Sequence, residues 1–102
     1  MSSIAFDGTK VVLRQERWRH ITLRHPELKN AAHMILDAVT QPDEVYVDPT
    51  GAFHALKRVP TVSDFPVVIY GVNGEAYIRT AYFTSNSRKT RRYKKFRKLK
   101  PS

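Results

Sequence analysis

Apolar residues recur at helical spacing in the first half of the chain. Within the segment LRQERWRHITLR, the side chains of Leu13, Trp18 and Ile21 fall close to one stripe of a helix. This spacing predicts a first helix over residues 13–24. The helix should end at the Arg-His pair that precedes Pro26, because the residue before a proline is disfavoured in the α conformation.

A second helix is predicted to begin at Pro26 and to close at the Thr-Gln-Pro triplet of residues 40–42. Proline suits the first position of a helix, because the N–H that it lacks would have no partner there. The apolar positions that follow keep the i, i+3, i+4, i+7, i+8, i+11 pattern without a miss: Leu28, Ala31, Ala32, Ile35, Leu36 and Val39.

Short runs rich in β-branched and aromatic residues follow the second helix and indicate strands. The pair Asn73-Gly74 lies between the last two runs and is typical of a type I′ hairpin turn, in which both residues have positive φ. The last two strands are therefore predicted to be antiparallel neighbours. The four predicted strands cover residues 44–47, 52–59, 67–72 and 75–83.

These elements predict an α+β fold, in which two N-terminal helices pack on an antiparallel sheet of four strands. Residues 10–13 would add a fifth strand at the edge of the sheet. A chain of 102 residues is long enough for one domain. We expect that domain to occupy residues 1–87, because the composition changes abruptly after it.

Residues 88–102 carry the whole formal charge of the chain. They hold nine of the eighteen Lys and Arg residues and none of the nine Asp and Glu residues, so residues 1–87 are neutral. A dense run of cations repels itself, and we therefore expect a tail that is disordered alone or ordered on a partner. If the tail became helical, Tyr93, Phe96 and Leu99 would share one face.

Nucleic acid is the partner that this tail favours. Lys and Arg displace counterions from phosphates, and aromatic rings between them can stack on bases. The alternatives are a solvated tail that aids solubility or docks on another protein, and a membrane surface, which is the weakest of them and is not predicted. The cations predicted to bind the nucleic acid are Arg88, Lys89, Arg91, Arg92, Lys94, Lys95, Arg97 and Lys98.

Several chemistries lack the residues that they require. The chain has no cysteine, which excludes disulfides, thiolate metal sites and a Cys nucleophile. The four histidines show no HxH or HxxxH spacing, and no glycine-rich phosphate loop is present, so no metal and no cofactor is predicted. No run approaches the roughly 20 apolar residues of a membrane span. We expect a soluble, cytoplasmic protein.

The first predicted helix presents a face suited to phosphate chemistry. His20 lies three residues after Arg17 and four before Arg24, so one face carries an imidazole between two guanidinium groups. An imidazole can take or return a proton near neutral pH, and fixed cations stabilise charge on phosphorus. The alternative is an ordinary solvated helix face. His25 closes this helix and would face the same cleft, unless it serves only as a helix cap.

Two strands supply further candidates. Thr80 and Tyr82 are predicted to share one strand face with Ala76 and Ile78, where their hydroxyl groups could bind a phosphate; simple β propensity and core packing explain them equally well. In the run at 52–59, alternation does not decide which face is the core. Lys57 and Arg58, which point to opposite faces, are therefore competing candidates.

The segments ERWRHITLRHPEL, QPDEV and YIRTAYF, within about residues 10–85, resemble the phage-associated branch of the barnase, EndoU, colicin and RelE-like nuclease superfamily. The resemblance implies N-terminal helices before a four-stranded antiparallel sheet, and RNA cleavage without a metal by His, Lys or Arg, Thr or Ser, and Tyr. The positions to which it carries these roles are His20, Lys57 or Arg58, Thr80 and Tyr82, with His25 in the His-Pro-Glu motif as a further family-like position.

Our hypothesis from the sequence is a metal-independent endoribonuclease, with a toxin module as one form of it, that cleaves RNA by attack of the 2′-hydroxyl. In it, His20 is the general base or acid, Thr80 and Tyr82 position the scissile phosphate, and Lys57 or Arg58 with Arg24 stabilise the developing charge. Its partners would be messenger, transfer or ribosomal RNA and an antitoxin or immunity protein. The alternative is a noncatalytic nucleic-acid-binding module that uses the basic tail.

Overall fold

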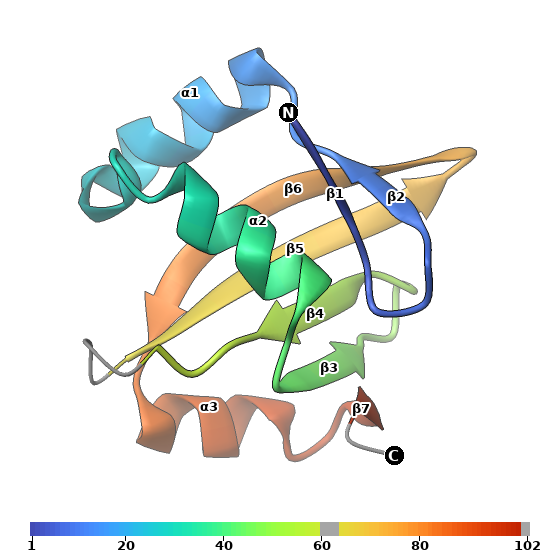
Figure 1. Ribbon diagram of the computed structural model, residues 1–102. Coiled ribbons are helices and arrows are strands. Elements are labelled where there is room, and N and C mark those ends of the chain that lie inside the picture. The colour runs from blue at the N-terminus through green and yellow to red at the C-terminus, as the bar shows by residue number, and fades with distance from the viewer. Residues whose placement is uncertain (60–63, 101–102) are drawn as a thin grey trace.

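Seven strands form one mixed sheet in the order β1-β2-β6-β5-β4-β3-β7 (Figure 1). The computed structural model describes residues 1–59 and 64–100. Each pair of neighbouring strands is antiparallel except β2 and β6, which are parallel. The strands are β1 (Ser2–Ile4), β2 (Lys10–Val12), β3 (Glu44–Val47), β4 (Phe53–Leu56), β5 (Phe65–Asn73), β6 (Glu75–Thr84) and β7 (Arg97–Lys100).

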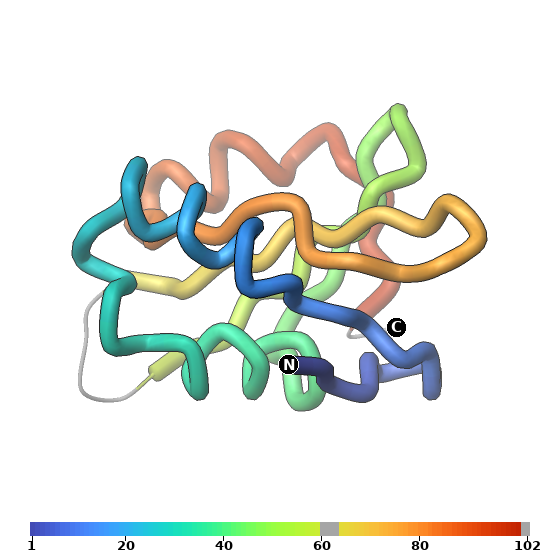
Figure 2. The backbone as a smooth tube through the Cα atoms, turned by 90° about the horizontal axis from the view of Figure 1, so that it is seen from above, coloured from blue at the N-terminus to red at the C-terminus, as the bar shows by residue number. Residues whose placement is uncertain are grey.

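Helices lie on both sides of this sheet. They are α1 (Gln15–Arg24), α2 (Ala32–Thr40) and α3 (Asn86–Tyr93), with a short 3-10 turn, η1, at Pro26–Leu28. Seen from above, α2 and α3 lie on opposite sides of the strands (Figure 2). The α+β class is confirmed, whereas the predicted sheet of four or five antiparallel strands with two helices is too small and lacks the parallel β2–β6 pair.

Each face of the sheet carries its own apolar cluster. The main core joins α1 and α2 to one face and includes Ile21, Ile35, Val45, Val68 and Ile78. The cluster under α3 is smaller. It consists of Tyr46, Leu56, Val67 and Tyr93, with Ile69, Tyr82 and Phe96 packed against it.

The predicted second helix is interrupted. Its first turn is η1, and α2 begins only at Ala32, after Ala31 with φ −114° and ψ 21°. Asn30 falls in the intervening turn, in keeping with the competition of its side chain for backbone hydrogen bonds. The apolar pattern did not reveal this break, because Leu28 and Ile35 are both buried although they lie on different elements.

The four central strands and the last hairpin are confirmed, but the turn differs from the expected type. Asn73 pairs with Glu75, and only Gly74 between them has a positive φ, of 79°. No residue other than glycine has a positive φ within residues 1–59 and 64–100. A type I′ turn with both Asn73 and Gly74 in the left-handed region is therefore wrong.

The strand expected at residues 10–13 is present as β2, but it is not the edge of the sheet. β1 pairs with its outer side, and β2 itself lies beside β6. Within the described part of the chain, no helix is long and apolar enough to cross a membrane.

The expectation of a disordered segment after residue 87 is wrong for residues 88–100. They form most of α3 and all of β7, and β7 pairs with β3 in the same sheet as the rest of the chain. Tyr93 explains this order, because its side chain is only 4% exposed in the cluster under α3. Tyr93, Phe96 and Leu99 do not share one helical face, since α3 ends at Tyr93 and Leu99 lies in β7. Residues 101–102 lie outside the described residues.

Candidate functional site

A hollow of about 270 Å³ lies between α1 and β6. It brings together the helix face singled out in the sequence and one of the two hydroxyl residues of the last strand. The lining residues are Arg17, His20, Ile21 and Arg24 from α1 and Arg79 and Thr80 from β6.

The α1 side of the hollow follows directly from helical spacing. Ile21 is 3% exposed and fixes the helix against the core, while Arg17, His20 and Arg24 are exposed around it. The predicted face with an imidazole between two guanidinium groups is therefore confirmed. Neighbouring residues extend the surface, since a second hollow of about 380 Å³ is lined by Arg14, Glu16, Arg17 and His20.

The β6 side depends on a β-bulge. Thr80 pairs with Ile69 and Ile78 pairs with Tyr70, so Arg79 has no partner on β5. A bulge places one extra residue on the strand and changes the direction of the neighbouring side chains. Arg79 and Thr80 consequently line the same hollow, although they are adjacent in sequence.

This bulge corrects the predicted alternation of the last strand. Ala76 and Ile78 belong to the main core, as does Ala81 on the other side of the bulge. Thr80 and Tyr82 pair with Ile69 and Val67, which belong to the cluster under α3. Thr80 and Tyr82 thus share a face, but Ala76 and Ile78 lie on the opposite one.

The formally charged side chains that line the hollow are all cationic. Among the described residues, Arg17, Arg24 and Arg79 form no ion pair with a carboxylate. No acidic residue is among the described residues that line this hollow, whereas Glu16 lines the second one. Three arginines without a carboxylate partner among the described residues therefore line the hollow together with His20, an arrangement suited to an anion.

Tyr82 and His25 lie together beside the hollow but do not line it. Their ring centroids are 6.1 Å apart with 34° between the planes, and Nδ1 of His25 is 3.7 Å from a carboxylate oxygen of Glu27. The guanidinium carbon of Arg92 lies 5.6 Å from the Tyr82 ring centroid. The Tyr82 hydroxyl is buried and has no hydrogen-bond partner among the described residues. Tyr82 thus offers its ring rather than its hydroxyl to this region.

The structure places neither Lys57 nor Arg58 at the His20 hollow. Lys57 Nζ donates a hydrogen bond of 2.8 Å to the carbonyl of Gln41 and lies 3.7 Å from the carboxylate of Asp37, on the α2 side. The guanidinium of Arg58 lies 5.2 Å from the ring centroid of Phe65. Both residues instead line a separate hollow of about 440 Å³ beside α2.

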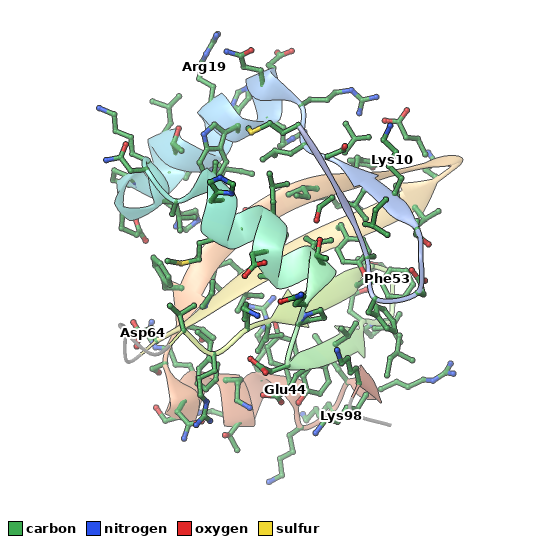
Figure 3. The ribbon with its side chains drawn as sticks, viewed as in Figure 1. Lys10, Arg19, Glu44, Phe53, Asp64 and Lys98 are labelled. Atoms are coloured by element: carbon green, nitrogen blue, oxygen red, sulfur yellow. The ribbon has the colours of Figure 1, made fainter. Side chains whose placement is uncertain are left out.

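The cations of the C-terminal segment differ in their surroundings. Lys89 is largely covered and donates a hydrogen bond of 2.6 Å to Glu44, which lies where β3 passes α3 (Figure 3). Burial opposes ionisation of Glu44, but its hydrogen bonds with Lys89 and Tyr46 hold its pKa below the ordinary value. Lys98 lies 6.0 Å from the Tyr46 ring centroid. The cations that are exposed are Arg88, Arg91, Arg92, Lys94, Lys95, Arg97 and Lys98.

A buried polar network was not foreseen from the sequence. His54, which is 1% exposed, contacts Asp48 Oδ2 through Nε2 at 2.8 Å and the Tyr93 hydroxyl through Nδ1 at 2.9 Å. Burial lowers the pKa of His54, and Asp48 opposes this only in part. Burial works against ionisation of Asp48, yet hydrogen bonds from Thr50 and His54 hold its pKa well below the usual range. A neutral His54 therefore donates to Asp48 and accepts from Tyr93.

Only the strand position of His54 was visible in the sequence. Its partner Tyr93 belongs to the segment that was expected to be disordered, so no local signal could join the two. The position of Arg79 at the hollow could likewise not be predicted, because a β-bulge does not change the alternation of apolar residues in the sequence.

Comparisons of this chain with protein-family models, with curated proteins and with solved structures found no match. Among the described residues, no group of three or more His, Asp or Glu side chains is arranged to hold a metal ion.

Proposed function

We propose that this protein is an endoribonuclease whose active site is the hollow between α1 and β6. The observation that carries the proposal is the position of His20, which shares the hollow with three arginines and the side chain of Thr80. This arrangement contains a proton acceptor, cations and a hydroxyl donor, which are the groups needed for phosphoryl transfer without a metal.

In the proposed reaction, His20 takes the proton of a ribose 2′-hydroxyl. The 2′-oxygen attacks the adjacent phosphorus, the bond to the 5′-oxygen breaks, that oxygen takes a proton from water, and the hydroxide left behind takes the proton held by His20. The products are a 2′,3′-cyclic phosphate and a 5′-hydroxyl. The guanidinium groups of Arg17 and Arg24 stabilise the charge on the phosphate oxygens, and the Thr80 hydroxyl donates a hydrogen bond to one of them.

RNA is favoured as the substrate by charge and by surface composition. The cations of α3 continue the basic character of the surface beyond Tyr82, where the guanidinium of Arg92 lies against the ring. A strand of phosphates could therefore contact the hollow and α3 together, releasing counterions from both. The resemblance of the RHPEL and YIRTAYF segments to metal-independent nucleases supports the same reaction.

A noncatalytic RNA-binding module is the second candidate. The observation in its favour is that His20 is the only proton-transfer residue of the ordinary His, Asp, Glu or Lys type among the described residues that line the hollow. Under this alternative, the arginines and the exposed cations of the C-terminal segment supply affinity, and His20 contributes no chemistry.

The test is RNA cleavage in excess EDTA by the purified protein, by a His20→Ala variant and by a His33→Ala variant. His33 is an exposed histidine of α2 that lines the separate hollow, so its variant is a matched control. We expect new 2′,3′-cyclic phosphate ends with the wild type and His33→Ala, and none with His20→Ala. Equal cleavage by all three would remove His20 from the site, and tight binding without cleavage would favour the noncatalytic module.

A further inference from the structure

Gly71 on β5 leaves room for one particular side chain of β6. A Cβ atom built on Gly71 would lie 2.5 Å from Cζ of Arg79, well inside van der Waals contact. Gly71 does not have a positive φ, so the backbone conformation does not require glycine here. The missing side chain is instead explained by the guanidinium that occupies its place.

The Arg79 guanidinium is confined from more than one side. Arg79, which the β-bulge leaves without a partner on β5, lines the hollow, and its guanidinium lies over Gly71. Tyr77, which pairs with Gly71, lies on a further side, with its ring centroid 5.7 Å from Arg79 Cζ. Bulge, glycine and aromatic ring together hold an arginine that has no carboxylate partner among the described residues.

We propose that Arg79 is the phosphate-binding residue that faces His20 across the hollow, and that Gly71 is a positioning residue that sets where its guanidinium lies. This inference rests on the proposed function. It assigns to Arg79 the role for which Lys57 and Arg58 were the candidates in the sequence. A guanidinium held in place before the substrate binds stabilises charge on phosphorus without the cost of reorganisation during the reaction.

The experiment compares four variants with the wild type: Arg79→Ala, Gly71→Ala, the double variant and Arg19→Ala. Arg19 is the control arginine, since it points from α1 away from the sheet into solvent (Figure 3). Arg79→Ala should lower kcat/KM for RNA cleavage by about 10²-fold, as expected for loss of one positioned donor. Gly71→Ala should lower kcat/KM in the same direction, because the new methyl group displaces the guanidinium.

The double variant separates positioning from general damage. If Gly71 acts only through Arg79, then Gly71→Ala should cause no further loss in the Arg79→Ala background. Thermal unfolding should remain close to wild type, because the atom that must move is the far end of a flexible side chain. If Gly71→Ala lowered kcat/KM by the same factor in the wild type and in the Arg79→Ala variant, the role of Gly71 would be overturned. Unchanged kcat/KM in Arg79→Ala would overturn the role of Arg79.

A binding measurement keeps this inference separate from the proposed catalysis. With a single-stranded DNA of the same base sequence, which lacks the 2′-hydroxyl and cannot be cleaved by this reaction, Arg79→Ala should reduce the salt-dependence slope of log K by about 0.7. Arg19→Ala should leave that slope unchanged. If the wild type binds but does not cleave RNA, only the proposed catalysis fails, whereas an unchanged slope in Arg79→Ala would overturn the phosphate contact itself.

Discussion

Removal of one hydroxyl group should measure what holds the C-terminal segment on the sheet. In a Tyr93→Phe variant the ring can stay stacked on Tyr46, with centroids 4.6 Å apart, and only the hydrogen bond of 2.9 Å to His54 is lost. Nδ1 of His54 then has no donor at a site where the side chain is 1% exposed. A buried polar atom without its partner costs about 1 to 3 kcal/mol of unfolding free energy.

The Tyr93→Ala variant sets the scale for the whole contact. It removes the ring as well as the hydroxyl, and truncation of a buried aromatic side chain costs about 3 to 5 kcal/mol. Burial raises the pKa of Tyr93, and the neighbouring Tyr82 hydroxyl raises it further. Adding Tyr82→Phe to Tyr93→Phe therefore excludes rescue of His54 by Tyr82.

Urea unfolding followed by circular dichroism measures these differences, and hydrogen exchange shows where they act. Tyr77→Phe is the control, because the Tyr77 hydroxyl has no hydrogen bond among the described residues. We expect faster exchange in α3 for Tyr93→Phe and no change for Tyr77→Phe. If Tyr93→Phe, alone and with Tyr82→Phe, lay within about 0.5 kcal/mol of the wild type, the buried network would not stabilise the docking of α3.

Four further outcomes follow from the structure. Burial lowers the pKa of His54 below 6.5, so in mildly acidic solution the unfolded chain binds a proton that the folded chain excludes. The unfolding free energy should therefore fall as the pH drops below 6.5, by up to about 1.4 kcal/mol per pH unit. Urea midpoints measured across this pH range check the prediction, and His54→Asn should remove the slope. Because the pKa of Asp48 is lowered, its carboxylate contributes to the unfolding free energy above about pH 3.8, and this contribution is lost in more acidic solution. Acid unfolding should therefore begin at higher pH in Asp48→Asn. Lys89→Ala leaves Glu44, whose side chain is 16% exposed, without its cation. This should lower the unfolding free energy by about 1 to 2 kcal/mol in the same urea assay. Deletion of residues 86–102 should abolish cooperative unfolding in calorimetry.

The central strands could be predicted because their signals are local. Each run of β-forming residues stands between turn residues, and the Asn73-Gly74 pair fixes which two runs are neighbours. The helix face of His20 was visible for the same reason, since three residues at helical spacing need no knowledge of the rest of the chain. Thr80 joined it in the structure because β6 passes α1.

The features that sequence reasoning missed depend on contacts between distant segments. The bulge at Arg79 exists only relative to the register of β5, and the interruption before Ala32 leaves the apolar pattern intact. His54 looks like one more residue of a short strand until Tyr93 is brought to it from 39 positions away. Local pattern therefore located the elements, whereas long-range pairing decided which side chains meet.

The C-terminal segment shows why net charge alone was a poor guide to order. Repulsion among its cations opposes folding, but exposed cations can remain hydrated and screened, while the buried ring of Tyr93 gains packing and a hydrogen bond that do not depend on salt. Only Lys89 is drawn into a close ion pair, with Glu44, among the described residues of the segment. Seven of the other cations are exposed to solvent on a folded scaffold. A phosphate chain that binds them would meet charges carried by an ordered backbone, on α3, on β7 and between them, and the entropy cost of ordering a tail would not reduce its affinity.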